Sequence, residues 1–149
     1  MGLRNLTVDE VIWMNRFVLE KFPAKRADQH EVLNYTGLQE LIQSIRHSRK
    51  HFYAKTTLLL IGLVQGHFFA SGNRRTALQA VGTFATLNRR KVYIWRIRFI
   101  RQVLIGIRER YYSDEEIKMW VKQGDIRPFN RFQTPSKGTK NRSKRIKQA

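Results

Sequence analysis

The sequence contains no cysteine, few acidic residues and no long apolar run. Without cysteine, the chain can form neither a disulfide nor a thiolate metal site, which favours an intracellular protein. The most apolar patch, Leu58–Val64, is too short to span a membrane. Asp9 and Glu10 interrupt the N-terminal segment, so this segment lacks the pattern of a secretory signal. Together these absences predict a cytoplasmic protein with no membrane segment.

Acidic residues are scarce in comparison with basic ones. The 149 residues include 29 lysines and arginines but only 11 aspartates and glutamates, so the formal net charge is +18. A charge of this size favours solubility or an anionic partner, such as nucleic acid, a nucleotide, an acidic protein or a membrane surface. Composition alone does not choose among these. The length suits one domain with a sizeable core.

Apolar residues recur at helical spacing through most of the chain and predict six helices. Thr7 and Glu10 form a capping box that opens the first helix, over 7–22, and Pro23 stops it. The segment that follows, residues 23–35, is expected to be a polar loop. The predicted fold class is all-α. The remaining helices are expected over 37–47, 52–65, 74–87, about 97–111 and about 113–122.

Several shorter segments also carry a signal. Val92–Trp95 is expected to be a short extended piece, and Ser113 opens the sixth helix with a second capping box. Trp13 and Trp120 are expected in the core or at its edge. Residues 127–149 carry eight basic residues and no acid, which predicts a disordered basic tail, either solubilising or in non-specific contact with nucleic acid. The helical domain is therefore expected to cover 1–126 and the tail 127–149.

The most informative stretch is Gly66–Ala77, with the sequence GHFFASGNRRTA, which lies between two apolar helical segments. Gly72 permits a sharp turn or a close approach to a ligand. From Asn73 on, the residues can open a helix whose N–H groups and dipole attract an anion, and the two arginines that follow are suited to phosphate oxygens. His67 is the nearest proton acceptor at neutral pH. The residue types favour a phosphate-handling loop, and they are also compatible with a solvated helix start beside a core histidine.

The stretch HFFASGNRRTA resembles the motif of the Fic/Doc (Fido) family, H-x-F-x-[D/E/N]-[G/A]-N-[G/K]-R. The likeness covers roughly residues 3–126. Four further stretches resemble helices of the family: LTVDEVIWMNRF, Phe52–Gly66, TALQAVGTFATLNRRKVYI and EEIKMWVKQG. Arg-Thr-Ala at the end of the motif is similar to the death-on-curing (Doc) toxin branch. The resemblance implies a compact Fido-like bundle. It also implies transfer of a phosphate-containing group from ATP, usually with Mg²⁺, to a protein hydroxyl: AMP in most members and phosphate in the Doc branch.

The resemblance also implies roles for individual residues. His67 would be the general base that activates the hydroxyl of the target, a step that needs a proton acceptor near neutral pH. Phe69 would anchor the loop in the core. The nucleotide phosphates would be held by the N-terminus of the following helix and by Gly72, Asn73, Arg74 and Arg75.

Two positions depart from the family's pattern. Ser71 stands where most members carry the acidic or Asn side chain that holds magnesium. A neutral hydroxyl is a poor ligand for this hard cation, so Ser71 is only a weak metal ligand and Mg²⁺ lacks its usual partner. Leu78 stands where AMP-transferring members often carry a further arginine, which favours phosphate transfer over AMP transfer.

Two functions from different classes follow from the sequence. The first is a Doc-like toxin of a toxin–antitoxin pair, a protein kinase or nucleotidyltransferase that acts in the cytoplasm on a protein such as a translation factor. No Ser/Thr-x-x-x-Glu-Gly/Asn helix is evident, so the resemblance implies a separate antitoxin protein as regulator. The alternative is a catalytically degenerate Fido-fold module whose basic surface binds nucleic acid or an acidic partner.

Overall fold

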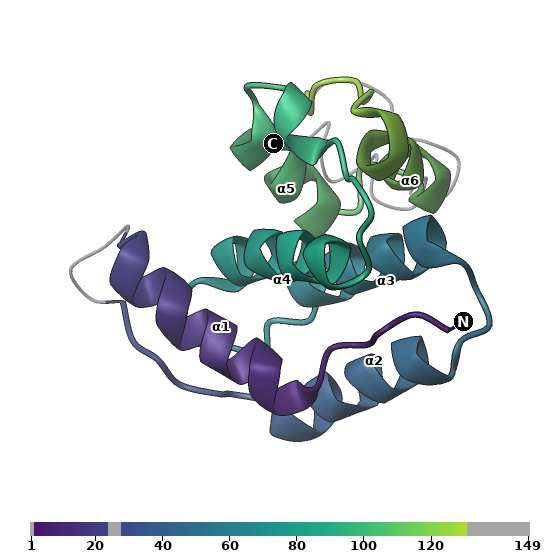
Figure 1. Cartoon of the computed structure of the whole chain (residues 1–149). Helices are drawn as coiled ribbons and strands as arrows, with labels where there is room; N and C mark the ends of the chain where they lie inside the picture. Colours follow the sequence, from purple (N-terminus) through teal and green to yellow (C-terminus); the bar gives the residue numbers. More distant parts are fainter. Residues whose placement is uncertain (1, 24–27, 131–149) are drawn as a thin grey trace. The chain divides into compact units, whose positions relative to one another are not determined.

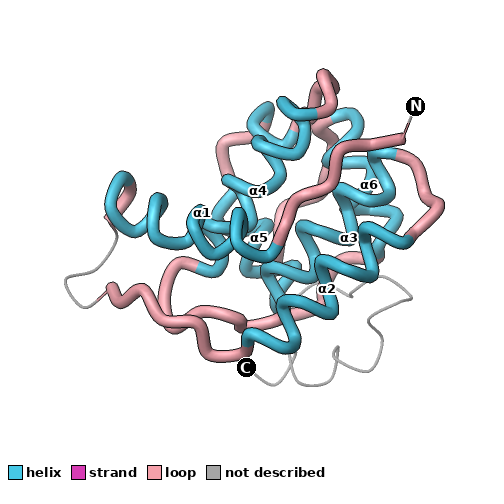
Figure 2. The backbone as a smooth tube through the Cα atoms, turned by 60° about the horizontal axis from the view of Figure 1, so that its bottom comes forward, coloured by secondary structure: helices cyan, strands magenta, loops and turns pink. Residues whose placement is uncertain are grey.

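The structure, a computed structural model, describes residues 2–23 and 28–130, which form six α-helices, one short 3-10 helix and no β-strand (Figure 1 and Figure 2). The all-α class predicted from the sequence is therefore confirmed. The chain divides into two compact units, Met1–Lys91 and Val92–Ala149. Beyond residue 130, the predicted tail lies outside the described residues. None of the helices in the described part combines the length and hydropathy needed to cross a membrane.

The first unit contains four helices, α1 (Val8–Lys21), α2 (Tyr35–His47), α3 (Phe52–Gln65) and α4 (Asn73–Leu87). The predicted capping box opens α1, since Thr7 Oγ1 accepts from the Glu10 N–H at 3.1 Å and Glu10 Oε1 accepts from the Thr7 N–H at 2.8 Å. The second helix begins two residues before its predicted start. Its cap is Asn34, whose side chain accepts from the Gly37 N–H at 2.9 Å.

Packing in this unit centres on α4, which contacts both α3 and α1 (Figure 1). Ala77 and Ala80 of α4 are fully buried, and Phe84 stacks on Phe52 of α3 with ring centroids 5.3 Å apart. On its other side, α3 approaches α2 at Gly62, where a Cβ atom would lie 2.5 Å from a Leu41 methyl group. Small residues therefore let these helices pack closely, and the packing fixes the ends of α3 and α4 that the intervening loop connects.

The buried face of α1 differs from the prediction at Trp13. This side chain is 60% exposed and stacks on Phe17 with ring centroids 5.2 Å apart, so the expectation that it lies in the core or at its edge is wrong. The reason is helical phase, because residues three and four apart share a face and only one face of α1 packs inward. The buried residues of α1 are Val11, Met14, Asn15 and Val18.

The second unit contains η1 (Ile94–Arg96), α5 (Ile100–Arg108) and α6 (Asp114–Gln123). The extended piece expected over Val92–Trp95 is wrong at its end, because the Arg96 N–H donates to the Tyr93 carbonyl at 3.1 Å and closes a 3-10 turn. The Ser113 capping box is confirmed at the start of α6, and Gly124 ends this helix with φ 82°. Trp120 is fully buried, as predicted.

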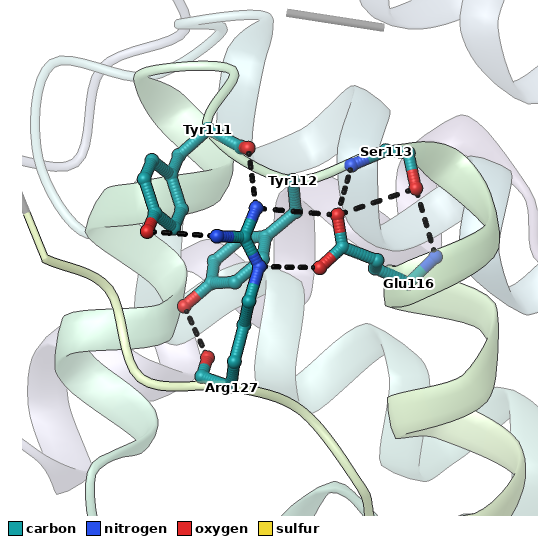
Figure 3. A network of polar contacts seen from close by, with 5 residues as sticks. All are labelled: Tyr111, Tyr112, Ser113, Glu116 and Arg127. Atoms are coloured by element: carbon teal, nitrogen blue, oxygen red, sulfur yellow. Dashed lines mark hydrogen bonds and ion pairs between the residues drawn. The ribbon is translucent and has the colours of Figure 1, made fainter. Parts of the chain in front are cut away.

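Arg127, which the sequence assigned to the tail, is held within the second unit (Figure 3). Its Nε donates to Glu116 Oε2 at 2.6 Å, its Nη1 donates to the Tyr111 hydroxyl at 2.9 Å, and its guanidinium lies 4.3 Å from the Tyr111 ring centroid. Burial alone would raise the pKa of Glu116, but hydrogen bonds from Arg127 and Ser113 outweigh it and hold this pKa below its usual value. Ordered packing therefore continues past residue 126.

A hollow of about 750 Å³ lies beside this network. Its lining includes Ile97, Phe99 and Met119 and three acidic residues, Glu115, Glu116 and Asp125. The lining contains no imidazole and no aliphatic hydroxyl, so it offers no histidine base and no serine or threonine nucleophile. The candidate catalytic residues lie in the first unit.

Candidate functional site

The candidate site is built on the loop that joins α3 to α4. At its start, the Gly66 N–H donates to the Gly62 carbonyl at 2.9 Å and ends α3. His67 follows with φ 51°, a left-handed conformation that residues other than glycine seldom adopt. Such a conformation costs about 1–3 kcal/mol and persists only where neighbouring structure imposes it. The His67 side chain is exposed, so its imidazole is accessible to a ligand.

The segment 28–34 runs beside this loop and holds its backbone. Val32 and Phe69 form an isolated antiparallel bridge, and the Leu33 N–H donates to the Phe68 carbonyl at 2.7 Å. The Phe69 side chain is buried, with 1% of its surface exposed. Backbone pairing on one side and a buried aromatic ring on the other thus leave the loop little freedom to shift.

The end of the loop is shaped by Gly72 and Asn73. Gly72 has φ 78°, and a Cβ atom there would lie 2.9 Å from a Leu19 methyl group and 3.3 Å from Asn15 Nδ2. The Asn73 side chain accepts from the Phe69 N–H at 3.1 Å and donates to the Phe69 carbonyl at 2.8 Å. The Asn73 amide therefore braces the loop, while the first N–H groups of α4 have no acceptor within the helix.

A buried asparagine connects α1 to both ends of this turn. Asn15 is fully buried; its Nδ2 donates to the Ser71 carbonyl at 2.8 Å and to Thr76 Oγ1 at 3.1 Å. Its Oδ1 lies 2.8 Å from His30 Nδ1 and is an acceptor, so His30 must donate from Nδ1. When His30 is neutral, its Nε2 therefore carries the lone pair. Burial and the neighbouring Arg16 lower the pKa of His30.

Arg75 is bound by a carboxylate in the structure. Its Nη1 donates to Asp28 Oδ2 at 3.0 Å and its Nη2 donates to Asp28 Oδ1 at 3.2 Å, a bidentate ion pair. Nη1 also donates to the Phe22 carbonyl at 2.8 Å. Asp28 has 8% of its side-chain surface exposed and Arg75 has 24%, so water reaches this pair only in part. Arg74, next to it, is half-buried.

The residues around Ser71 do not form a site for a divalent cation. Ser71 Oγ accepts from the Gln29 N–H at 3.1 Å, and a neutral hydroxyl is a weak ligand for Mg²⁺. Within residues 2–23 and 28–130 there is no group of three or more His, Asp or Glu side chains that could hold a metal ion. The donor set around Ser71 therefore does not fit Mg²⁺.

Three residues of the site escaped the sequence analysis. Asn15 had a signal, because it is a polar residue on the apolar face of α1. Asp28 and His30 had none, since they lie in the loop after α1 and no periodic pattern connects them with the motif. Asp28 precedes its partner Arg75 by 47 residues.

Comparison with known proteins identifies the region that holds this loop. The Fic/DOC family model matches residues 5–85, which is more than half of the chain and contains the whole segment from His67 to Arg75. No curated protein matches the sequence at a significant level.

Proposed function

Because the chain belongs to the Fic/DOC family, we propose that it transfers a phosphate, or AMP, from ATP to a hydroxyl of a target protein, with His67 as the general base. Members of this family are typically transferases of this kind. The observation that carries the proposal is the position of His67, an exposed imidazole at the start of a braced loop that leads into the N-terminus of α4.

The proposed reaction follows from these groups. The target's hydroxyl oxygen attacks the γ-phosphorus of ATP while His67 takes the hydroxyl proton, and the bond to the leaving ADP breaks. For AMP transfer, the attack is at the α-phosphorus and pyrophosphate leaves. Phosphoryl transfer asks little of a protein beyond positioning and positive charge.

The phosphate chain would be bound at the start of α4. Gly72 turns the backbone, and the N–H groups of the first helical turn, which have no acceptor within the helix itself, favour an anion at the helix end. Arg74 and Arg75 add positive charge in the same turn. Asn73 acts there through the shape of the loop, because both ends of its amide bind Phe69.

The finer assignment is to the Doc-like branch. Leu78 stands where a further arginine would contact the nucleotide in AMP-transferring members, which favours phosphate transfer. We propose that the protein acts in the cytoplasm as the toxin of a toxin–antitoxin pair, on a protein such as a translation factor, and that a separate antitoxin controls it. Mg²⁺ would then enter with the nucleotide rather than on a ligand set of this chain.

The test is a labelling assay with a cell extract and ATP that carries the label on either the γ- or the α-phosphate. We expect transfer of the γ-label to a protein, and a fall of roughly 10²–10⁴-fold in rate for His67→Ala. His47→Ala is the matched control, because His47 is an exposed histidine whose Nδ1 bonds the carbonyl of Gln43 in its own helix. Transfer of neither label, or an undiminished rate in His67→Ala, would refute the enzymatic proposal.

A second candidate function is a non-catalytic module that binds nucleic acid or an acidic partner. The net charge of +18 favours it, as does the engagement of Arg75 by Asp28. Such binding depends steeply on salt, because each contacted phosphate releases counterions. Nucleic-acid binding that weakens steeply with salt, together with no measurable binding of ATP, would favour this function over the transferase.

A further inference from the structure

The guanidinium that the proposed reaction needs is already occupied by an anion. Both terminal nitrogens of Arg75 donate to the carboxylate of Asp28, at 3.0 and 3.2 Å, and Nη1 donates in addition to the carbonyl that ends α1 at Phe22. A carboxylate and a phosphate use the same two parallel donors of an arginine fork. A phosphate therefore cannot take this fork while Asp28 holds it.

Asp28 is also tethered next to the loop. The residue after it, Gln29, donates its N–H to Ser71 Oγ at 3.1 Å, and Val32 pairs with Phe69 a few residues further on. Because Asp28 is part of the same chain, it competes for Arg75 at a high effective concentration. A free anion of equal charge must reach a comparable concentration to displace it. The low exposure of the Asp28 side chain, 8%, strengthens the pair because water screens it less.

We propose that Asp28 is a built-in competitor for the anion site at Arg75, and that it makes the site selective for ligands with several phosphates. The identity of the ligand as a nucleotide rests on the proposed function; the competition rests on the ion pair alone. A triphosphate chain can bind the Arg75 fork and the N-terminus of α4 together, so it offsets the loss of the carboxylate. A single phosphate would only replace the carboxylate of Asp28 at the Arg75 fork, so little binding free energy is gained.

The test is isothermal titration of the full-length protein with inorganic triphosphate, ATP and inorganic phosphate, first without a divalent cation and then with Mg²⁺. Asp28→Asn removes the charge and keeps the size of the side chain. We expect it to bind triphosphate and ATP on the order of tenfold more tightly than the wild type, which corresponds to about 1.4 kcal/mol. Glu40→Gln is the control, because Glu40 is an exposed acid of α2 and its loss changes the net charge equally. It should leave both affinities unchanged.

Two further variants keep the test decisive. Asp28→Ala replaces Asp28→Asn if thermal melting shows that the latter is unfolded. Adding Arg75→Ala to Asp28→Asn should abolish the gain, since the gain comes from the released fork. An affinity for triphosphate that is equal in the wild type and in Asp28→Asn, or that is lower in the variant, overturns the proposal; a decrease seen only with Mg²⁺ would make Asp28 a metal ligand instead.

The outcome separates this inference from the proposed function. Tighter binding of inorganic triphosphate to Asp28→Asn, without transfer of label from ATP in any variant, supports the competitor and refutes the transferase. Label transfer by a protein whose affinities do not change with Asp28 supports the transferase and refutes the competitor. No binding of triphosphate by any variant overturns the competitor as well.

Discussion

Replacing Asn15 tests whether α1 holds the candidate loop. In Asn15→Ala, three hydrogen bonds of 2.8–3.1 Å are lost. Thr76 is fully buried, so water cannot replace the hydrogen bond that its hydroxyl loses. Leaving a buried polar group without a partner destabilises the folded state by about 1–3 kcal/mol. Ser71 and His30 are half-buried, so water can replace part of what they lose. Together with the small cavity that the substitution leaves, we expect the free energy of unfolding to fall by about 2–4 kcal/mol.

This loss is a large part of the roughly 5–15 kcal/mol that stabilises an ordinary domain. The assay is urea unfolding followed by far-UV circular dichroism, with amide exchange of α4 to assign the change to the first unit. Gln43→Ala is the control, because Gln43 is an exposed amide of α2 and its removal should change the free energy of unfolding little. A loss below about 0.5 kcal/mol in Asn15→Ala, or one equal to the control, would refute the claim that this buried amide supports the loop.

Three further perturbations test other parts of the structure. Gly72→Ala should lower the free energy of unfolding by about 1–2 kcal/mol, since alanine at φ 78° is strained and its Cβ would contact Leu19; unchanged urea unfolding would contradict this. Glu116→Gln weakens the pair with Arg127 and should cost about 1–2 kcal/mol, seen as faster amide exchange in α6; unaltered exchange would contradict it. The third perturbation concerns pH. Burial and Arg16 lower the pKa of His30 in the folded protein, whereas the same side chain in the unfolded chain binds a proton below its usual pKa of 6.5. The free energy of unfolding therefore decreases as the pH falls through 6.5. His30→Asn keeps a donor toward Asn15 but does not titrate, so its thermal melting should depend less on pH; equal slopes would contradict the assignment.

The limits of α1 and α6 were predictable because local signals set them, whereas α5 has no side-chain cap and is shorter than the predicted 97–111, at Ile100–Arg108. The capping boxes at Thr7 and Ser113 place the starts of α1 and α6, and Gly124 places the end of α6. Where the prediction failed, a contact from elsewhere decided. Trp13 is a large aromatic residue of the kind often found in a core, but it lies on the face of α1 that does not pack against the neighbouring helices.

The C-terminal boundary shows the same limit. From composition, Arg127 belongs to a basic tail, because the residues after it are basic and little in them can be buried. In the structure its charge is compensated by Glu116, and its guanidinium lies 4.3 Å from the Tyr111 ring centroid (Figure 3). Composition averages over a segment, whereas one ion pair with an aromatic partner is enough to fix a single residue.

For the candidate site, the sequence supplied the chemical groups but not their availability. The motif gives an imidazole and two guanidinium groups, and regular geometry puts the guanidinium groups in the first turn of α4. In the structure Arg75 is paired with Asp28, which lies in a loop without any periodic pattern. The affinity of an arginine for an anion depends on the free energy of replacing the group that already binds it. Sequence patterns do not reveal that group when it comes from a segment distant in the sequence. A motif search can therefore find Arg75, but it does not find the carboxylate of Asp28 that binds this guanidinium in the structure.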